Sequence, residues 1–256
     1  MIELFKSWLA HPDIRNLDID DPRMTVMRRK ILKEKQFLRH IYLEWYTTIL
    51  DVIPLKVKPV LEIGSGAGFM NEIYPDLIAS EIFYCPEISV VLDGQRLPFS
   101  SSSIGSIVMT DVLHHIPHVR SFFLEAVRCL EPSGKVVMIE PYVSTWSRII
   151  YTYFHHEPFN PQAENWEFPS IGPLSSANGA LPWIIFERDI KQFEKEFPEL
   201  RLKSIQPMMP FCYILSGGVS LRTLMPDWTY SFWRLFENYF PKKMFGMFAL
   251  IELERI

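Results

Sequence analysis

Cysteine and long apolar runs are scarce in this chain. Only 3 of its 256 residues are cysteines, and none of Cys85, Cys129 and Cys212 belongs to a CxxC pair. Scattered thiols fit a reducing compartment and argue against a structural zinc site. No apolar run approaches the ~18 residues that a membrane span needs, and the N-terminus lacks the basic and apolar segments of a signal peptide. We therefore expect a cytoplasmic protein without a transmembrane segment.

A strong charge of either sign is also lacking. The formal net charge is −4, and the sequence contains no RNP pattern, zinc finger or strongly basic domain. We therefore expect no nucleic-acid partner. A predicted helix over residues 24–53 carries Arg28, Lys35 and Arg39 on one face. A basic face can bind phosphate or a membrane surface, but a solvated helix face is the more common meaning of this pattern and is our interpretation.

Glycines cluster in one place, the stretch LEIGSGAGF at residues 61–69. An apolar strand pattern precedes it and a possible helix start follows, an arrangement that aims backbone N–H groups at a ligand. A dinucleotide-binding turn requires GxGxxG, but Phe69 stands where the third glycine would be. The pattern is instead ExGxGxG, from Glu62 to Gly68, which weakens an NAD interpretation.

Strand and helix patterns alternate through the middle of the chain. Hydrophobic residues make up 48% of the sequence, which is ample for the core of one large α/β domain. The predicted strands lie near residues 57–63, 77–82, 88–92, 106–110, 135–140, 200–205 and 247–256. The clearest predicted helices cover residues 120–130 and 187–197. This alternation predicts a mainly parallel sheet.

Two segments interrupt the alternation. Residues 141–185 are rich in Pro, Ser, Asn and Gly and too long for an ordinary connection, so a lid or binding loop is expected there. Residues 207–245 are rich in Trp, Phe and Tyr. The tryptophans outside the alternating region could wall a pocket for an apolar or sugar-containing molecule, form a plain hydrophobic cap, or make the surface of a homodimer. They are Trp146, Trp166, Trp183, Trp228 and Trp233.

Five segments occur in an order that resembles the class I S-adenosylmethionine (SAM) dependent methyltransferases, in particular the small-molecule, type 11-like subgroup. They are LEIGSGAG, LIASEI, VVLDGQRLPF, GSIVMTDVLHHIPH and EAVRCLEPSGKVVMIEPY, and together they span about residues 57–142. The resemblance implies a Rossmann-like sheet of seven strands, mainly parallel with the last strand antiparallel, and helices on both faces. It also implies one methyltransferase domain over residues 1–256.

Within that domain we expect four parts. They are an N-terminal helical cap (1–55), the SAM-binding core (56–142), an insertion or lid (143–185), and the C-terminal part of the sheet (186–256) with the aromatic insertion 207–245.

The same resemblance implies how the cofactor would be held. Glu62 would face the ammonium end of SAM, and Glu81 would accept hydrogen bonds from both ribose hydroxyls. Asp93 would accept from the adenine amino group. The remaining expected contacts are Gly64, Ser65, Gly66 and Gly68 in the glycine stretch, Ile82 after Glu81, Gly94 and Gln95 at the ring, and Thr110 and Asp111 at the methionine end. S-adenosylhomocysteine would be the product.

The spacing departs from the family in one region. Gly68 to Glu81 is short, and Glu81 to Asp93 leaves no room for a full helix between two strands. The helices on either side of Glu81 are therefore expected to be trimmed. Trimming would open the adenine side of the site or expose a surface for a partner.

Methyl transfer from SAM is an in-line displacement that depends mainly on positioning, although a hydroxyl acceptor benefits from a base. The expected catalytic residues are His115 after the fourth strand and Glu140 and Tyr142 after the fifth; His155 and His156 are further candidates. His114 and His118 have the i, i+4 spacing of a zinc site, but Pro117 interrupts that helix and no neighbouring ligand is evident. No metal is expected.

Two readings from different classes remain open. The leading one is a SAM-dependent enzyme that methylates a small molecule. The alternative is a SAM-binding regulatory or partner protein without turnover, which the trimmed helices would suit. A third option is a peripheral membrane enzyme that uses the basic helix at Arg28–Arg39.

Overall fold

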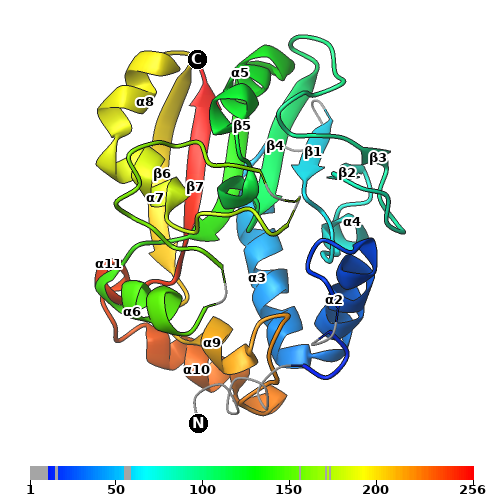
Figure 1. Cartoon of the computed structure of the whole chain (residues 1–256), viewed down its shortest axis with the longest axis vertical. Coiled ribbons are helices and arrows are strands. Elements are labelled where there is room, and N and C mark those ends of the chain that lie inside the picture. Colours follow the sequence, from blue (N-terminus) through cyan, green and yellow to red (C-terminus); the bar gives the residue numbers. More distant parts are fainter. Residues whose placement is uncertain (1–10, 15–16, 55–58, 156, 171, 173) are drawn as a thin grey trace.

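The computed structural model describes residues 11–14, 17–54, 59–155, 157–170, 172 and 174–256. The first residues of the strand predicted from residue 57, and the candidate His156, lie outside the described residues. Within them, one twisted sheet lies between helices (Figure 1).

The sheet has seven strands in the order β3-β2-β1-β4-β5-β7-β6. The strands are β1 (Val60–Ile63), β2 (Leu77–Glu81), β3 (Val90–Val91), β4 (Ile104–Thr110), β5 (Leu130–Pro141), β6 (Leu200–Met208) and β7 (Phe248–Arg255). β1 to β5 pair in parallel, and β7 runs antiparallel to both of its neighbours. The predicted mainly parallel sheet with an antiparallel last strand is confirmed.

Helices and turns connect these strands. They are α2 (Pro22–Glu34), α3 (Gln36–Val52), α4 (Met70–Ile73), η1 (Leu113–His115), α5 (Val119–Cys129), α6 (Thr145–Tyr153), α7 (Leu181–Trp183), η2 (Ile184–Arg188), α8 (Ile190–Glu196), α9 (Cys212–Ser216), η3 (Asp227–Thr229), α10 (Tyr230–Glu237) and α11 (Lys242–Phe245). Among the described residues, no helix is both long and apolar enough to cross a membrane.

Alternate residues of the central strands supply two separate apolar cores. In β4, Ile107 and Met109 pack in the cluster that contains the aromatic residues of α5 and α8. Val108 points the other way and packs in the cluster that contains α3. Because the side chains of a strand alternate between its faces, continuous apolar strands of this kind require cover on both sides.

The helix predicted over residues 24–53 is interrupted at Lys35, which gives α2 and α3. The Lys35 ammonium donates to the carbonyl oxygens of Gly218 and Leu221. Arg39 lies over the ring of Phe69, and Arg28 lines a cavity. Our interpretation of these three residues as a solvated basic face is therefore wrong, since Lys35 and Arg39 contact other parts of the protein and Arg28 lines the cavity.

α3 packs on the sheet near the two connections that are shorter than in the family, those on either side of β2. α4 is only four residues long, and residues 82–89, between β2 and β3, form no helix. Phe37, Ile41 and Trp45 of α3 are fully buried in one cluster with Val60 and Val108 of the sheet. The N-terminal helix thus supplies apolar cover that short crossovers cannot.

The aromatic insertions fold partly as core and partly as surface. Trp166 is buried, beneath the Arg120 guanidinium and donating to Asp189. Trp146 lines the cavity described below, whereas Trp228 is 84% exposed beside α10. Figure 1 shows α6, α9, α10 and α11 gathered at one end of the molecule, opposite the C-terminus. The tryptophans therefore do not form one common pocket wall.

We expect Ile41→Ala to lower the free energy of unfolding by about 2–5 kcal/mol, because a fully buried side chain is removed from the core under α3. Val26→Ala in α2 is the control. Val26 is 45% exposed, so its loss should cost less than about 0.5 kcal/mol. Urea unfolding of both variants checks this, and equal small effects would show that α3 is not part of the core.

Candidate active site

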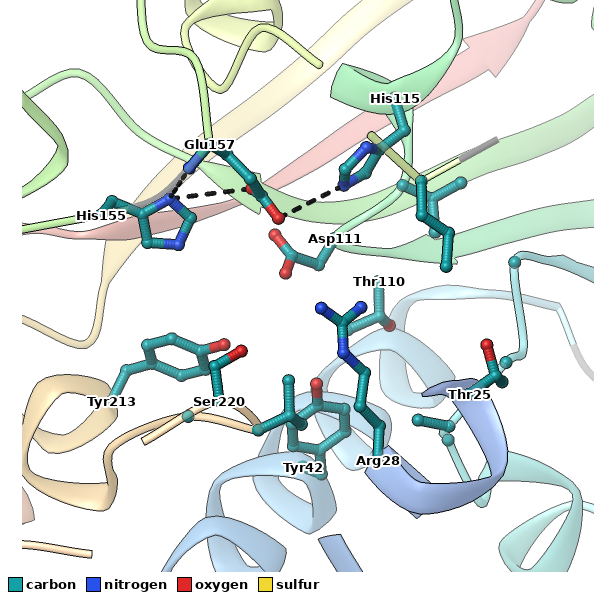
Figure 2. A pocket seen from close by; sticks show the side chains of 18 of the residues that line it. Thr25, Arg28, Tyr42, Thr110, Asp111, His115, His155, Glu157, Tyr213 and Ser220 are labelled. Atoms are coloured by element: carbon teal, nitrogen blue, oxygen red, sulfur yellow. Dashed lines mark hydrogen bonds and ion pairs between the residues drawn. The ribbon is translucent and has the colours of Figure 1, made fainter. Parts of the chain in front are cut away.

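A cavity of about 1080 Å³ opens at the carboxyl ends of the parallel strands, where open α/β sheets bind ligands. Its walls come from α2 and α3, the glycine stretch, the segments after β2, β3 and β4, α6, and residues 213–224. Figure 2 shows side chains from several of these segments converging on it. The volume exceeds the range of about 300–1,000 Å³ typical of a site for one small molecule. It can therefore hold two.

Three glycines of the stretch at residues 61–69 are required because neighbouring side chains leave no room for a Cβ. Gly64 has φ +70°, and a Cβ there would lie 2.5 Å from Cγ2 of Val112. Gly66 has φ +34°, and its Cβ would lie 2.8 Å from Oε2 of Glu81. A Cβ at Gly68 would strike the Tyr46 hydroxyl. All three glycines line the cavity. The loop is thus held tightly between neighbouring side chains while its other side faces the open volume.

Glu62 ends β1 with a buried carboxylate that lines the cavity. Its Oε2 accepts a hydrogen bond from the Ser65 hydroxyl at 2.6 Å. Burial, only partly offset by Ser65, and the nearby charge of Glu81 raise the pKa of Glu62 to about 7. A cationic ligand beside this carboxylate would restore its usual acidity.

Glu81 and Ile82 lie at the end of β2, beside the glycine stretch. Oε1 of Glu81 accepts from the Ile82 amide at 2.7 Å, which leaves Oε2 close to Gly66. Burial raises the pKa of Glu81. Ile82 is 42% exposed and lines the cavity. The trimmed crossover therefore leaves an apolar side chain open at this edge.

Asp93, Gly94 and Gln95 form a turn that also lines the cavity. Oδ1 of Asp93 accepts from the Gln95 amide at 2.9 Å, and the Gln95 side chain donates to both Asp93 oxygens. This exposed turn presents a carboxylate and backbone groups together. It could bind a flat, amine-bearing ring.

Thr110 and Asp111 follow β4, and both line the cavity. Oγ1 of Thr110 is buried and makes no hydrogen bond with the described residues. Asp111 has φ +63°, an uncommon conformation for a residue other than glycine. Burial raises the pKa of Asp111 to about 7, although His114 opposes this. The Thr110 hydroxyl is therefore available to a partner that the described residues do not supply, whereas the Asp111 carboxylate faces His114.

Glu140 and Tyr142 do not line the cavity. Oε1 of Glu140, which is fully buried, accepts from the amides of Val112 and Leu113, and Oε2 contacts Nδ1 of His114 at 2.7 Å. Burial, together with Glu187, raises the pKa of the Tyr142 hydroxyl to about 12. The catalytic roles expected for these two residues are untested, but their positions favour structural ones. β5 directs them away from the open volume.

His115 does line the cavity. Its Nδ1 lies 3.0 Å from the Ser176 carbonyl oxygen, so Nδ1 carries the proton and donates it. Nε2 is then left with its lone pair, 3.8 Å from Oε1 of Glu157. Burial and the neighbouring His114 lower the pKa of His115 to about 4.

Glu157 and several residues from α2 and α3 reach the cavity although our sequence analysis did not select them for it. Figure 2 shows Arg28 reaching toward Thr110 and Asp111, with Tyr42 close by. Tyr46 and Tyr213 add to the wall. The basic pattern of Arg28 was visible in the sequence, but nothing there placed it against β4. Glu157 is distant in sequence from every motif, so only the folded insertion reveals it.

Comparison with known proteins agrees with this architecture. A family model described as a methyltransferase domain matches residues 61–138. Together with the demethylmenaquinone methyltransferase described next, this match supports a class I SAM-dependent methyltransferase, as the sequence motifs led us to expect. The glycine stretch lies inside the matched region.

A demethylmenaquinone methyltransferase from Paenarthrobacter aurescens is 26% identical in an alignment 129 residues long that covers 43% of this chain. The match spans about half (50%) of that relative's length. Among solved structures, geranyl diphosphate C-methyltransferase from Streptomyces coelicolor has a TM-score of 0.51 at 11% identity, over 98% of this chain and 88% of the other.

A methyltransferase bound to the Haloferax volcanii activator Trm112 also has a TM-score of 0.51, at 12% identity over 94% of this chain and 99% of the other. At these identities the structural matches show the fold of this chain and no more.

We expect Gly64→Ala to destabilise the methyltransferase by about 1–3 kcal/mol, since the added Cβ meets Val112 at a residue with positive φ. Gly94→Ala is the matched control in the same cavity. A Cβ there would meet nothing closer than 3.4 Å. Thermal unfolding of both variants checks this, and an unchanged Gly64→Ala midpoint would contradict the packing account.

Proposed function

We propose that this methyltransferase binds SAM in the glycine-lined half of the cavity and transfers its methyl group to a small, largely apolar molecule in the other half. The observation that carries the proposal is one continuous cavity with two chemically different ends. One end combines tight backbone turns with carboxylates. The other is walled mainly by aromatic and aliphatic side chains.

The first end suits a zwitterionic, cationic nucleoside derivative. The buried carboxylate of Glu62 suits the ammonium group, and Oε2 of Glu81, which lies beside Gly66, suits the ribose hydroxyls. The Asp93 turn suits the adenine amino group, and the unpaired Thr110 hydroxyl suits the methionine end. When bound, SAM supplies a methyl group on a positively charged sulfur. These residues would bind and orient it.

The second end suits an apolar acceptor. Its walls include aromatic side chains on α6 and in the segment after β6, together with aliphatic residues of the same segments. They are Trp146, Ile150, Tyr151, Phe154, Tyr213, Ile214, Leu221, Leu224 and Met247. Walls of this kind exclude water from the acceptor and position it by contact area. The Paenarthrobacter relative is named for demethylmenaquinone, and this name supports an apolar acceptor.

Asp111 and His115 stand where the two ends meet, and both line the cavity. Of the three residues expected to be catalytic, His115 alone reaches the cavity, so we propose that it contacts the acceptor. The chain would act mainly by holding the acceptor atom about 3–3.5 Å from the methyl carbon, in line with the bond that breaks. The segment after β4 would set that alignment.

Glu81→Gln should weaken SAM binding about 10–100-fold in calorimetry, because an amide cannot accept two charge-assisted hydrogen bonds. Glu199→Gln, at an exposed position on the far edge of the sheet, is the control and should bind normally. Release of S-adenosylhomocysteine with a panel of quinols, phenols and glycosides then tests turnover. SAM binding without release would favour a regulatory or partner role, and no binding would overturn the proposal.

SAM affinity should also rise with pH. Glu62 is mostly protonated below its pKa of about 7, and the cofactor ammonium would favour the ionised carboxylate, so binding releases a proton. Affinity should increase about 5–10-fold from pH 6 to pH 7.5 and then level off. Glu62→Gln should reduce this dependence, and the part that remains would come from Asp111, whose pKa is also raised to about 7. A wild-type affinity that is flat across this range would show that Glu62 does not meet the cation.

A further inference from the structure

Four potential metal ligands lie together on the acceptor side of the cavity. The Nε2 atom of His114 lies 3.5 Å from Oε2 of Glu157 and 3.9 Å from Oδ1 of Asp111. Nε2 of His115 lies 3.8 Å from Oε1 of Glu157. The nearest donor atoms of His114, His115 and Glu157 all lie within 4.8 Å of one another. Two segments, residues 111–115 after β4 and the insertion that contains Glu157, thus bring these side chains close together.

These separations suit a shared ion better than direct hydrogen bonds. A hydrogen bond to nitrogen spans about 2.7–3.2 Å, and every separation in the cluster is longer. Ligand atoms placed about 2.0–2.2 Å from one tetrahedral Zn²⁺ lie about 3.3–3.6 Å apart. The three measured separations, of 3.5, 3.8 and 3.9 Å, lie within a few tenths of an ångström of this range.

Both histidines are held in the orientation that metal ligands require. Nδ1 of His114 lies 2.7 Å from the Glu140 carboxylate, and Nδ1 of His115 lies 3.0 Å from the Ser176 carbonyl oxygen. Metal-ligating histidines usually donate their other ring N–H to just such a carboxylate or carbonyl. Each ring is thereby fixed with Nε2 toward Glu157. Glu140, which is buried outside the cavity, would thus hold the His114 ring in place as a metal ligand.

A second, independent observation concerns His114 itself. Its side chain is 0% exposed, and Nε2 makes no hydrogen bond with any described residue. A buried polar nitrogen without a partner is costly. This nitrogen faces Oε2 of Glu157 at 3.5 Å and Oδ1 of Asp111 at 3.9 Å, so a cation placed among the three atoms would contact all of them.

We propose that His114, His115 and Glu157, with Asp111 as a fourth donor, bind a divalent first-row transition metal such as Zn²⁺. The mixed imidazole and carboxylate set favours such an ion over Mg²⁺ or Ca²⁺, which prefer oxygen alone. Figure 2 shows that Glu157, Asp111 and His115 face the open volume. His114, His115 and Glu157 would occupy three positions of a tetrahedral ion, and Asp111 would occupy the fourth. The site does not depend on the proposed methyl transfer.

The experiment titrates the full chain, dialysed against a chelator, with Co²⁺ and follows its visible absorption. We expect one Co²⁺ per chain, displaced by Zn²⁺. Glu157→Gln should weaken binding by more than about 100-fold, beyond the effect of losing a supporting residue. His115→Gln serves as a second variant if the first fails to fold. His118→Gln is the control, because His118 is exposed and lies outside the cavity wall.

SAM titration of the same samples separates this inference from the proposed function. Ion binding that is lost in Glu157→Gln and kept in His118→Gln would support the site, whether or not SAM binds. Wild-type protein that takes up no Co²⁺ would overturn it, even with SAM bound normally. Co²⁺ binding that is equal in the wild type and Glu157→Gln would show that the ion sits elsewhere, and would also overturn it.

Discussion

The hydrogen bonds that Glu140 accepts from the segment after β4 are the interactions on which the rest of the site depends. A single buried carboxylate accepts from two successive backbone amides, of Val112 and Leu113, and contacts the ring of His114. Removing a buried acceptor of this kind would leave several donors unsatisfied, and each would carry a desolvation penalty. Neighbouring strands β4 and β5 therefore fix the turn, as their register requires Glu140 to lie beside it.

The segment after β4 in turn positions residues on both the cofactor side and the acceptor side of the cavity. On the cofactor side, Val112 is pressed against Gly64, so the residue at position 64 can carry no Cβ. On the acceptor side, Asp111 is held at positive φ and His114 and His115 are aimed at Glu157. One structural carboxylate thus couples the geometry of the proposed cofactor end to that of the proposed acceptor end, without touching either ligand.

The sequence predicted the features that depend on local pattern. The apolar strands, the glycine turn and the ordered motifs were sufficient for the mainly parallel sheet with its antiparallel last strand, and for the residues along the strand ends, such as Glu62, Glu81 and Asp93. These lie where they do because parallel strands end at one edge of the sheet. Sequence reasoning failed where long-range packing decides. Arg28 lines the cavity only because α2 folds back over it, and Glu157 reaches the histidines only through the insertion.

Pattern alone also could not separate a residue at a site from one that supports it. Glu140 and His115 both follow strands and both carry functional groups, yet one points into the protein and the other into the cavity. Their difference is set by side-chain direction at a strand end. The short spacing between Gly68 and Glu81 predicted that α4 would be short. The sequence did not show that α3 packs on the sheet beside it.

The most direct test of the account is a crystal structure of the full chain with S-adenosylhomocysteine. The account predicts the homocysteine end beside Glu62 and Thr110, the ribose on Glu81, the adenine at the Asp93 turn, and the aromatic half of the cavity still open. A product molecule lying in the aromatic half, or outside the cavity, would contradict the division of this cavity into a cofactor end and an acceptor end.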